Sequence, residues 1–155
     1  MPSGDGWANV KDLIVATAKM TGVDPSLLAT MCGIESSFRI KAKPKPNTSS
    51  AKGLFQFVSG TWKEKLKRYG AKYGINPSTP PTDPRANALM AAEYIKENAS
   101  YLEDRLGRQP NDNDLYMAHF LGGGGAVKLL SAPPSAIGER VNPDAAAANN
   151  AIILS

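Results

Sequence analysis

Apolar residues recur at the spacing of an amphipathic helix along most of this sequence. The first such segment runs from Trp7 to Met20 and is followed by Gly22. The second begins at Asp24-Pro25, where an aspartate suited to capping precedes a proline suited to the first helical position. Its inward face is predicted to carry four apolar side chains, those of Leu27, Leu28, Met31 and Cys32. The same helix should end close to Glu35.

The rest of the chain continues this helical pattern with one interruption. Helices are predicted over Trp62 to Tyr73, Asp83-Pro84 to about Leu106, Asn113 to Leu121 and Ala126 to Leu130, with a last alanine-rich helix after Asn142-Pro143. The interruption is a proline-containing loop from Ile40 to Ala51, followed by Gly53 to Phe57, an apolar segment suited to one strand of a small hairpin or an extended edge. These patterns predict a mainly α-helical fold with at most a small β-hairpin.

Composition is that of an ordinary globular chain. Its 155 residues suit one domain, and 42% of them are hydrophobic and 21% charged. The single cysteine excludes an internal disulfide, and one thiol with one histidine makes no structural metal site. We therefore expect one domain over residues 1–155, with no metal and no cofactor.

Positive charge is concentrated in one third of the chain. Residues 39–72 hold ten basic residues and one acid, Glu64, a net charge of +9 that leaves −5 for the remainder. Such asymmetry favours a polyanionic partner, for which cell wall, teichoic acid, lipopolysaccharide and nucleic acid all qualify. A solvated helix face beside a charged loop is the alternative interpretation.

Glu35 is the candidate catalytic group. Met31 and Cys32 precede it by one helical turn and Phe38 follows it, so the carboxylate is expected in apolar company. Loss of hydration raises the pKa of a carboxyl group, and a general acid needs a proton that persists near neutral pH. The alternative is a glutamate at a helix end that points into water.

Four stretches of sequence, in a fixed order, carry a resemblance to a known family. They are Gly33–Phe38 (GIESSF), Lys52–Phe57 (KGLFQF), Asp83–Leu102 (DPRANALMAAEYIKENASYL) and Leu115–Ala126 (LYMAHFLGGGGA). Together they resemble the soluble-type, goose-lysozyme-like lytic transglycosylases, which cleave the glycan strands of bacterial cell walls. Phe55 replaces the usual methionine of the second motif. The fourth motif departs from the usual A-Y-N-A-G and is similar to the phage-borne variety.

The resemblance implies a lysozyme-like single domain and a reaction. The motifs fall within residues 10–130, which leaves 131–155 as a C-terminal helical extension. Glu35 would act as the single acid and base that cleaves the β-1,4 bond between N-acetylmuramic acid and N-acetylglucosamine, giving 1,6-anhydromuramyl ends. The substrate-binding candidates are Ser37, Gln56, Phe57, Tyr94, Tyr116 and His119. A cleft is expected between the end of the Glu35 helix and the helix that carries Tyr116 and His119.

Several of these residues also have purely structural interpretations. Gln56 offers both a donor and an acceptor to a sugar but suits a surface turn as well, and Tyr94 suits packing. Gly53 and the Gly122–Gly125 run allow the backbone to come close to a glycan. Cys32 suits a small core residue better than a nucleophile paired with His119.

Carboxylates that could assist Glu35 are missing from the region that follows it. No Asp or Glu occurs between Glu35 and Glu64, whereas a glycoside hydrolase needs a second carboxylate. This absence favours the transglycosylase reaction. Two alternatives stay open: a goose-type lysozyme hydrolase that uses Asp112 or Asp114 as base, and a non-catalytic basic module that binds cell wall or nucleic acid.

The expected partner is the peptidoglycan glycan strand, with no nucleic acid and no membrane span. The first ten residues lack the basic and apolar segments of a secretory signal. We therefore expect a phage particle or a larger parent protein as carrier, and a location in the virion or, after delivery, in the periplasm or cell wall of a bacterial host.

Overall fold

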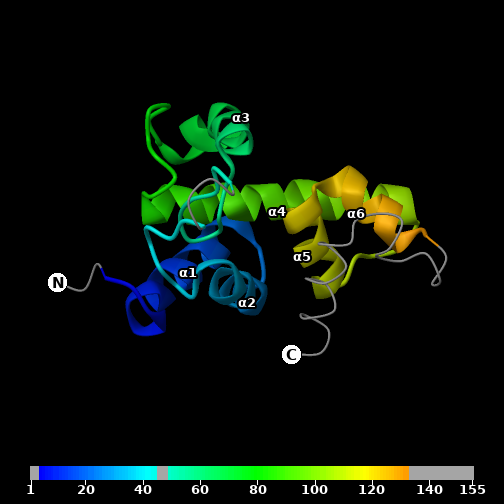
Figure 1. Cartoon of the computed structure of the whole chain (residues 1–155), viewed down its shortest axis with the longest axis horizontal. Helices are drawn as coiled ribbons and strands as arrows, with labels where there is room; N and C mark the ends of the chain where they lie inside the picture. Colours follow the sequence, from blue (N-terminus) through cyan, green and yellow to red (C-terminus); the bar gives the residue numbers. More distant parts are fainter. Residues whose placement is uncertain (1–3, 45–48, 133–155) are drawn as a thin grey trace. The chain divides into compact units, whose positions relative to one another are not determined.

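The computed structural model describes residues 4–44 and 49–132, and the regular elements among these residues are all helices (Figure 1). The elements are α1 (Trp7–Thr21), α2 (Pro25–Ser36), α3 (Ser59–Tyr69), the 3-10 helix η1 (Gly70–Tyr73), α4 (Pro84–Leu106), α5 (Asp112–Leu121) and α6 (Gly123–Leu130). The prediction of a mainly α-helical fold is confirmed.

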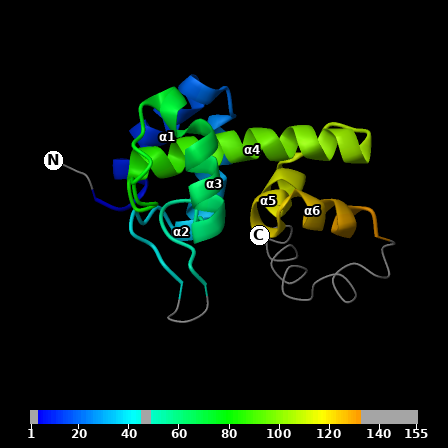
Figure 2. The ribbon, with the colours of Figure 1, turned by 90° about the horizontal axis from the view of Figure 1, so that it is seen from above.

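The chain divides into two compact units, Met1–Tyr94 and Ile95–Ser155, and α4 runs as one unbroken helix across the division. The expectation of a single domain stays a prediction. Within the first unit, α1 and α2 lie side by side in both views (Figures 1 and 2). Within the second unit, α5 packs against α6.

Helix α2 begins and ends as the sequence suggests. Asp24 caps it, since its side chain accepts a hydrogen bond from the Ser26 N–H at 2.9 Å, and Pro25 occupies the first helical position. The four predicted inward side chains, those of Leu27, Leu28, Met31 and Cys32, are all buried. This burial fixes the rotation of α2 about its axis and places Glu35 on the last turn.

The predicted helix from Trp62 to Tyr73 is in fact two elements. Helix α3 ends at Tyr69, and the chain tightens at Gly70 into η1. A side chain at Gly70 would lie 3.2 Å from Leu66 and 3.3 Å from the Ile75 carbonyl, so the tightening depends on close approach there. Lys65, on the inner face of α3, is buried with only 4% of its surface exposed, although its basic neighbours Lys63 and Lys67 face solvent.

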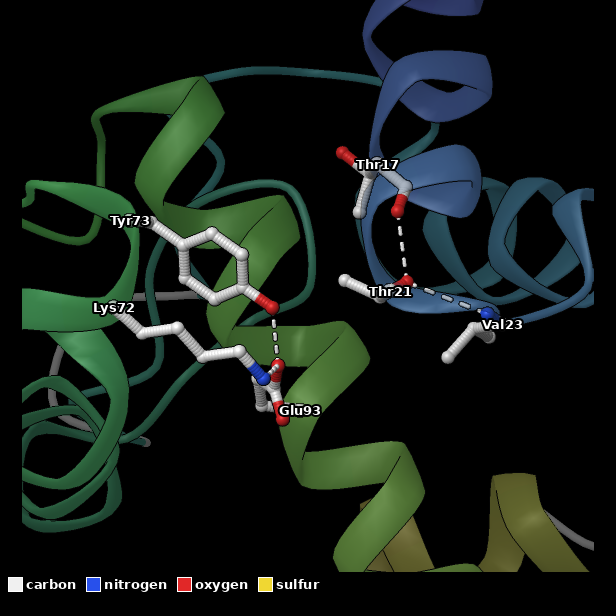
Figure 3. Close-up of polar contacts among 6 residues, drawn as sticks. All are labelled: Thr17, Thr21, Val23, Lys72, Tyr73 and Glu93. Atoms are coloured by element: carbon white, nitrogen blue, oxygen red, sulfur yellow. Dashed lines mark hydrogen bonds and ion pairs between the residues drawn. The ribbon is translucent and has the colours of Figure 1, made fainter.

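A buried carboxylate joins η1 to α4 (Figure 3). Glu93 of α4 is 4% exposed and forms an ion pair with Lys72 Nζ at 3.0 Å. The Tyr73 hydroxyl donates a short hydrogen bond to the same Glu93 oxygen. Because an unpaired buried charge is costly, these contacts favour one position of η1 on the first half of α4.

Helix α4 confirms its predicted start and end. The Asp83 carboxylate accepts from the Ala86 N–H at 2.9 Å ahead of Pro84, and Gly107 follows the last residue with a positive φ of 70°. Four buried alanines, Ala86, Ala88, Ala91 and Ala92, let neighbouring segments come close to its first half.

The segment from Gly53 to Phe57, which suits one strand of a small hairpin or an extended edge, forms a turn instead. Lys52 and Phe57 exchange two backbone hydrogen bonds, of 2.9 and 3.0 Å, as an isolated bridge, and the residues between them make a tight turn. We call residues 52–57 the Lys52–Phe57 turn. At Gly53, which has a φ of 86°, a side chain would lie 2.2 Å from the Pro81 carbonyl oxygen and 2.3 Å from Asn87 Nδ2. The close approach that glycine allows is therefore to the protein itself.

In the glycine run of the second unit, Gly122 separates α5 from α6 and the three glycines that follow it are helical. Helix α6 begins at Gly123, three residues before the predicted start. A side chain at Gly123 would lie 2.7 Å from the Tyr101 ring, so this glycine brings the first turn of α6 against that aromatic side chain. Helix α5 starts with a capping box between Asn111 and Asp114.

The predicted alanine-rich helix after Asn142-Pro143, and with it most of the 131–155 extension, lies outside the described residues. Among the helices that are described, none combines the length and apolar character needed to cross a bilayer.

Replacing Gly53 with Ala should unfold the first unit more readily. The substitution combines a strained positive φ with a clash against Pro81 and Asn87, so we expect the free energy of unfolding to fall by about 2 kcal/mol or more. Urea denaturation measures this change. Gly60→Ala is the matched control, because Gly60 lies in the first turn of α3 with nothing within 4 Å of an added side chain. An equal loss at both positions would contradict the role given to Gly53.

Candidate active site

Glu35 occupies the last turn of α2 and is partly buried. Burial raises the pKa of its carboxyl group from 4.5 to about 7. A substantial fraction of the group therefore carries a proton at neutral pH, as a general acid requires.

Cys32 lies beneath Glu35, one helical turn earlier, and is fully buried. Its Sγ lies 3.9 Å from Ser36 Oγ, and the Ser36 hydroxyl donates to the Cys32 carbonyl oxygen at 3.1 Å. Burial, with a smaller contribution from the Glu35 charge, raises the pKa of the thiol to about 11. A thiolate is scarce at neutral pH under these conditions, which argues for packing and against a nucleophile.

The chain turns sharply after Glu35. Ser37 and Phe38 both have positive φ values, 53° and 59°, an uncommon conformation for residues other than glycine. The Phe38 ring consequently lies against Gly33 and the Trp7 ring. The helical spacing used to place Phe38 over Glu35 does not apply, because α2 ends at Ser36. Ser37, a substrate-binding candidate, is exposed at this turn.

Asn87 holds the Lys52–Phe57 turn against α4. Its side chain is fully buried, and its Oδ1 accepts from the Phe55 N–H at 2.9 Å. Its Nδ2 donates to the carbonyl oxygens of Lys52 and Pro81 at 3.3 and 2.8 Å. Asn87 lies in the third of the four motif stretches, Asp83–Leu102. Its structural role could not be predicted from that stretch, because its partners lie up to 35 residues away in the sequence.

Gln56 is the last residue of this turn before Phe57, and its amide orientation is fixed. Its Nε2 donates to two carbonyl oxygens, those of Ala42 and Gly53, both at 2.9 Å. Since carbonyls only accept, the amide nitrogen must face them and Oε1 must face the other way. Within residues 4–44 and 49–132, no donor reaches Oε1. Gln56 therefore offers an acceptor to a ligand, and its donors are used within the protein.

Phe57 and Tyr94 pack against each other with ring centroids 6.1 Å apart. Phe57 is 3% exposed and also contacts the Trp62 ring, so it lines the interior behind Gln56. Tyr94 is half-buried, and Lys65 Nζ lies 4.9 Å from its ring centroid. A direct contact with substrate is open to Tyr94, whereas Phe57 in this position supports its neighbours.

Tyr116 and His119 belong to the second unit and lie on α5. Tyr116 is buried and His119 half-buried. Their expected cleft with Glu35 stays a prediction.

Two buried carboxylates outside the Glu35 region, those of Asp114 and Glu93, have structural partners. Asp114 Oδ2 accepts from Arg108 Nη1 at 2.6 Å and from the Asn111 N–H at 2.9 Å. Glu93 is paired with Lys72. No cluster of side chains suited to a metal ion occurs in the described part of the chain.

Comparison with known families gives one match. Residues 12–127 match the family described as the transglycosylase SLT domain. The matched segment contains Glu35, the Lys52–Phe57 turn, α4 and α5.

Glu35→Gln should remove a pH-dependent loss of stability. Between pH 4.5 and 7 the unfolded chain has lost the Glu35 proton while the folded protein retains it. Below about pH 4.5, Glu35 is protonated in both states and the contribution of this group to stability is fully present. As pH rises from 4.5 to 7, the unfolded chain gains from ionisation and the free energy of unfolding falls. The decline amounts to about 3 kcal/mol. Unfolding both proteins in urea at pH 4 to 8 should show the variant gaining relative to the original chain as pH rises. A difference independent of pH would contradict the shifted pKa.

Gln56→Glu should weaken the anchoring of the turn. A carboxylate cannot donate to the Ala42 and Gly53 carbonyls, so we expect a loss of roughly 1–3 kcal/mol at pH 7. The loss should shrink at pH 4, where a protonated carboxyl group can donate once. Unfolding free energies of variant and original chain, compared at each pH, measure this. Equal free energies of unfolding for the two proteins at pH 7 would contradict this structural role of Gln56.

Proposed function

This chain belongs to the transglycosylase SLT domain family, and we propose that it is a peptidoglycan lytic transglycosylase with Glu35 as its acid and base. Members of the family cleave peptidoglycan by lytic transglycosylation. The observation that carries the proposal for Glu35 is its position: a partly buried carboxyl group with a pKa of about 7, within the matched segment.

In the proposed reaction, Glu35 first donates its proton to the glycosidic oxygen between N-acetylmuramic acid and N-acetylglucosamine. The bond from that oxygen to the anomeric carbon of muramic acid breaks, and the 6-hydroxyl of the same sugar attacks this carbon. Glu35, now ionised, takes the proton of the hydroxyl. Every atom of the new 1,6-anhydro ring comes from the substrate, and the carboxyl group returns to its starting state.

An internal hydroxyl removes the need for a second carboxylate. The sugar ring holds the hydroxyl near its target, and such tethering gives an effective concentration far above that of a free reactant. The engagement of Asp114 with Arg108 and Asn111 supports this view, because that carboxylate already serves the start of α5. Asp112 is exposed on the first turn of α5 and stays the candidate base for the competing hydrolase reaction.

The contacts of Gln56, Tyr94 and Phe57 support a proposal for how the glycan is bound. Gln56 Oε1 would accept from a sugar hydroxyl or an acetamido N–H, since its Nε2 is already bound to Ala42 and Gly53. Tyr94 would contribute its ring and hydroxyl, with Phe57 behind it. The exposed hydroxyl of Ser37 would contact the glycan beside Glu35. Tyr116 and His119 would bind the glycan from α5.

The route to the cell wall is part of the proposal. We propose that a phage particle or a larger parent protein carries this domain, which then acts in the periplasm or wall of a bacterial host. The exposed cations Arg39, Lys41 and Lys43 would favour association with the anionic wall.

Glu35→Gln should lower glycan cleavage by a factor of about a hundred or more, because the amide has no proton to transfer. Mass spectrometry of digested peptidoglycan is the test. The original chain should release fragments with anhydro ends, lighter by one water than hydrolysed ends, and cleavage should decline above pH 7 as Glu35 ionises. A folded Glu35→Gln protein with full activity would overturn the mechanism. Reducing ends alone would instead indicate the goose-type lysozyme reaction, with Glu35 retained as acid.

A further inference from the structure

The turn that follows Glu35 is bound by residues that lead into α1 and by the first residue of that helix. Asp5 Oδ1 accepts a hydrogen bond from the Ile40 N–H at 2.8 Å, across 35 residues of sequence. The Gly6 N–H donates to the Phe38 carbonyl oxygen at 3.0 Å. Trp7 packs its ring on that of Phe38, with centroids 5.4 Å apart. We call residues 5–7 the Asp5–Trp7 clasp.

The clasp contacts a segment of strained backbone, Ser37 and Phe38. Ser37 and Phe38 are two successive non-glycine residues with positive φ, a conformation that persists only where surrounding contacts enforce it. Inside the turn, the Ser37 N–H donates to the Gly33 carbonyl oxygen at 2.9 Å, and the Arg39 N–H and Nε both donate to the Ser36 carbonyl oxygen. These inner bonds close the last turn of α2, and the clasp supplies the contacts from a distant part of the chain.

The clasp is itself fixed in place. Asn9 Nδ2 donates to the Asp5 carbonyl oxygen at 2.8 Å, and the Gly6 carbonyl accepts from the Asn9 and Val10 N–H groups at the start of α1. Gly33 provides the space for Phe38, since a side chain there would lie 3.1 Å from the Phe38 ring. The start of α1 and the end of α2 therefore form one hydrogen-bonded unit around the residues after Glu35.

We propose that Asp5 is a positioning residue for Glu35: its hydrogen bond to Ile40, with the other contacts of the clasp, holds the last turn of α2 in the geometry that cleavage requires. The inference rests on the proposed function of Glu35. Asp5 does not touch the substrate. It acts through the backbone from Phe38 to Ile40, three to five residues beyond Glu35.

Loss of the clasp should lower kcat more than it changes substrate affinity. Without the clasp, Ser37 and Phe38 can move to negative φ, the last turn of α2 loosens, and the Glu35 carboxyl group leaves its place. Misplacement of a catalytic group by about 1 Å can cost up to a hundredfold in rate. Substrate affinity should change less than kcat. Of the proposed glycan contacts in the first unit, only Ser37 lies in the loosened turn, and Gln56 and Tyr94 keep their contacts with Gly53 and Lys65.

The test compares three variants of the full chain with the original on soluble glycan strands. Asp5→Ala should lower kcat about tenfold or more, with a smaller change in KM. Asp5→Asn should restore kcat, because the asparagine Oδ1 can accept the same hydrogen bond. Asp12→Ala is the charge-matched control on the exposed face of α1 and should behave as the original. Amide hydrogen exchange at Ile40 should accelerate in Asp5→Ala alone.

The outcomes separate this proposal from the one it rests on. Unchanged kcat in Asp5→Ala, in an active enzyme, overturns the positioning role whether or not Ile40 exchange accelerates. Equal losses in Asp5→Ala and Asp5→Asn also overturn it, because they assign the effect to charge rather than to the hydrogen bond. Absence of glycan cleavage by the original chain would overturn the proposed function, and the positioning role with it.

Discussion

The three hydrogen bonds of the Asn87 side chain are the constraint on which the first unit depends. They fix the Lys52–Phe57 turn to the first half of α4 and leave no polar atom of a buried amide unsatisfied. From that turn the chain of contacts continues to Ala42, which accepts from both Gly53 N–H and Gln56 Nε2. Ala42 in turn donates to the Arg39 carbonyl oxygen, in the segment that follows Glu35. The two motifs of the site are thus joined through backbone groups.

Strain in the described backbone gathers around these same motifs. Apart from glycines, the residues with positive φ in the described ranges are Ser37, Phe38 and Gln56, two that follow Glu35 and one that ends the turn before Phe57. Strained residues of this kind persist where surrounding contacts over-determine them, and they cluster at functional sites. Each of them has identified contacts. Phe38 is held by the clasp, Ser37 by the Gly33 carbonyl, and Gln56 by the Ala42 and Gly53 carbonyls.

Much of the fold could be predicted from the sequence, because its signals are local. Asp24-Pro25 and Asp83-Pro84 mark helix starts by capping chemistry, and both were placed correctly. The errors arose where a distant partner decides the outcome. The start of α6 at Gly123 depends on Tyr101, and the turn at Gly53 depends on Asn87 and Pro81. Glu35 was predicted as a carboxyl group with a raised pKa, and burial bears this out, although the Phe38 ring lies against Trp7 and Gly33. Asp5 carried no sequence signal, since its partner Ile40 is 35 residues away.

The reactivity of Cys32 can report local opening of the structure around α2. It is the single cysteine of the sequence, it is fully buried, and it lies one helical turn from Glu35. A thiol reagent can reach it only in molecules whose α2 has separated from its neighbours, so the labelling rate measures the free energy of that separation. No engineered probe is needed for such a measurement. The same burial shields the thiol from oxidants, so a change from reducing to oxidising surroundings would leave the packing of Cys32 next to Glu35 unchanged.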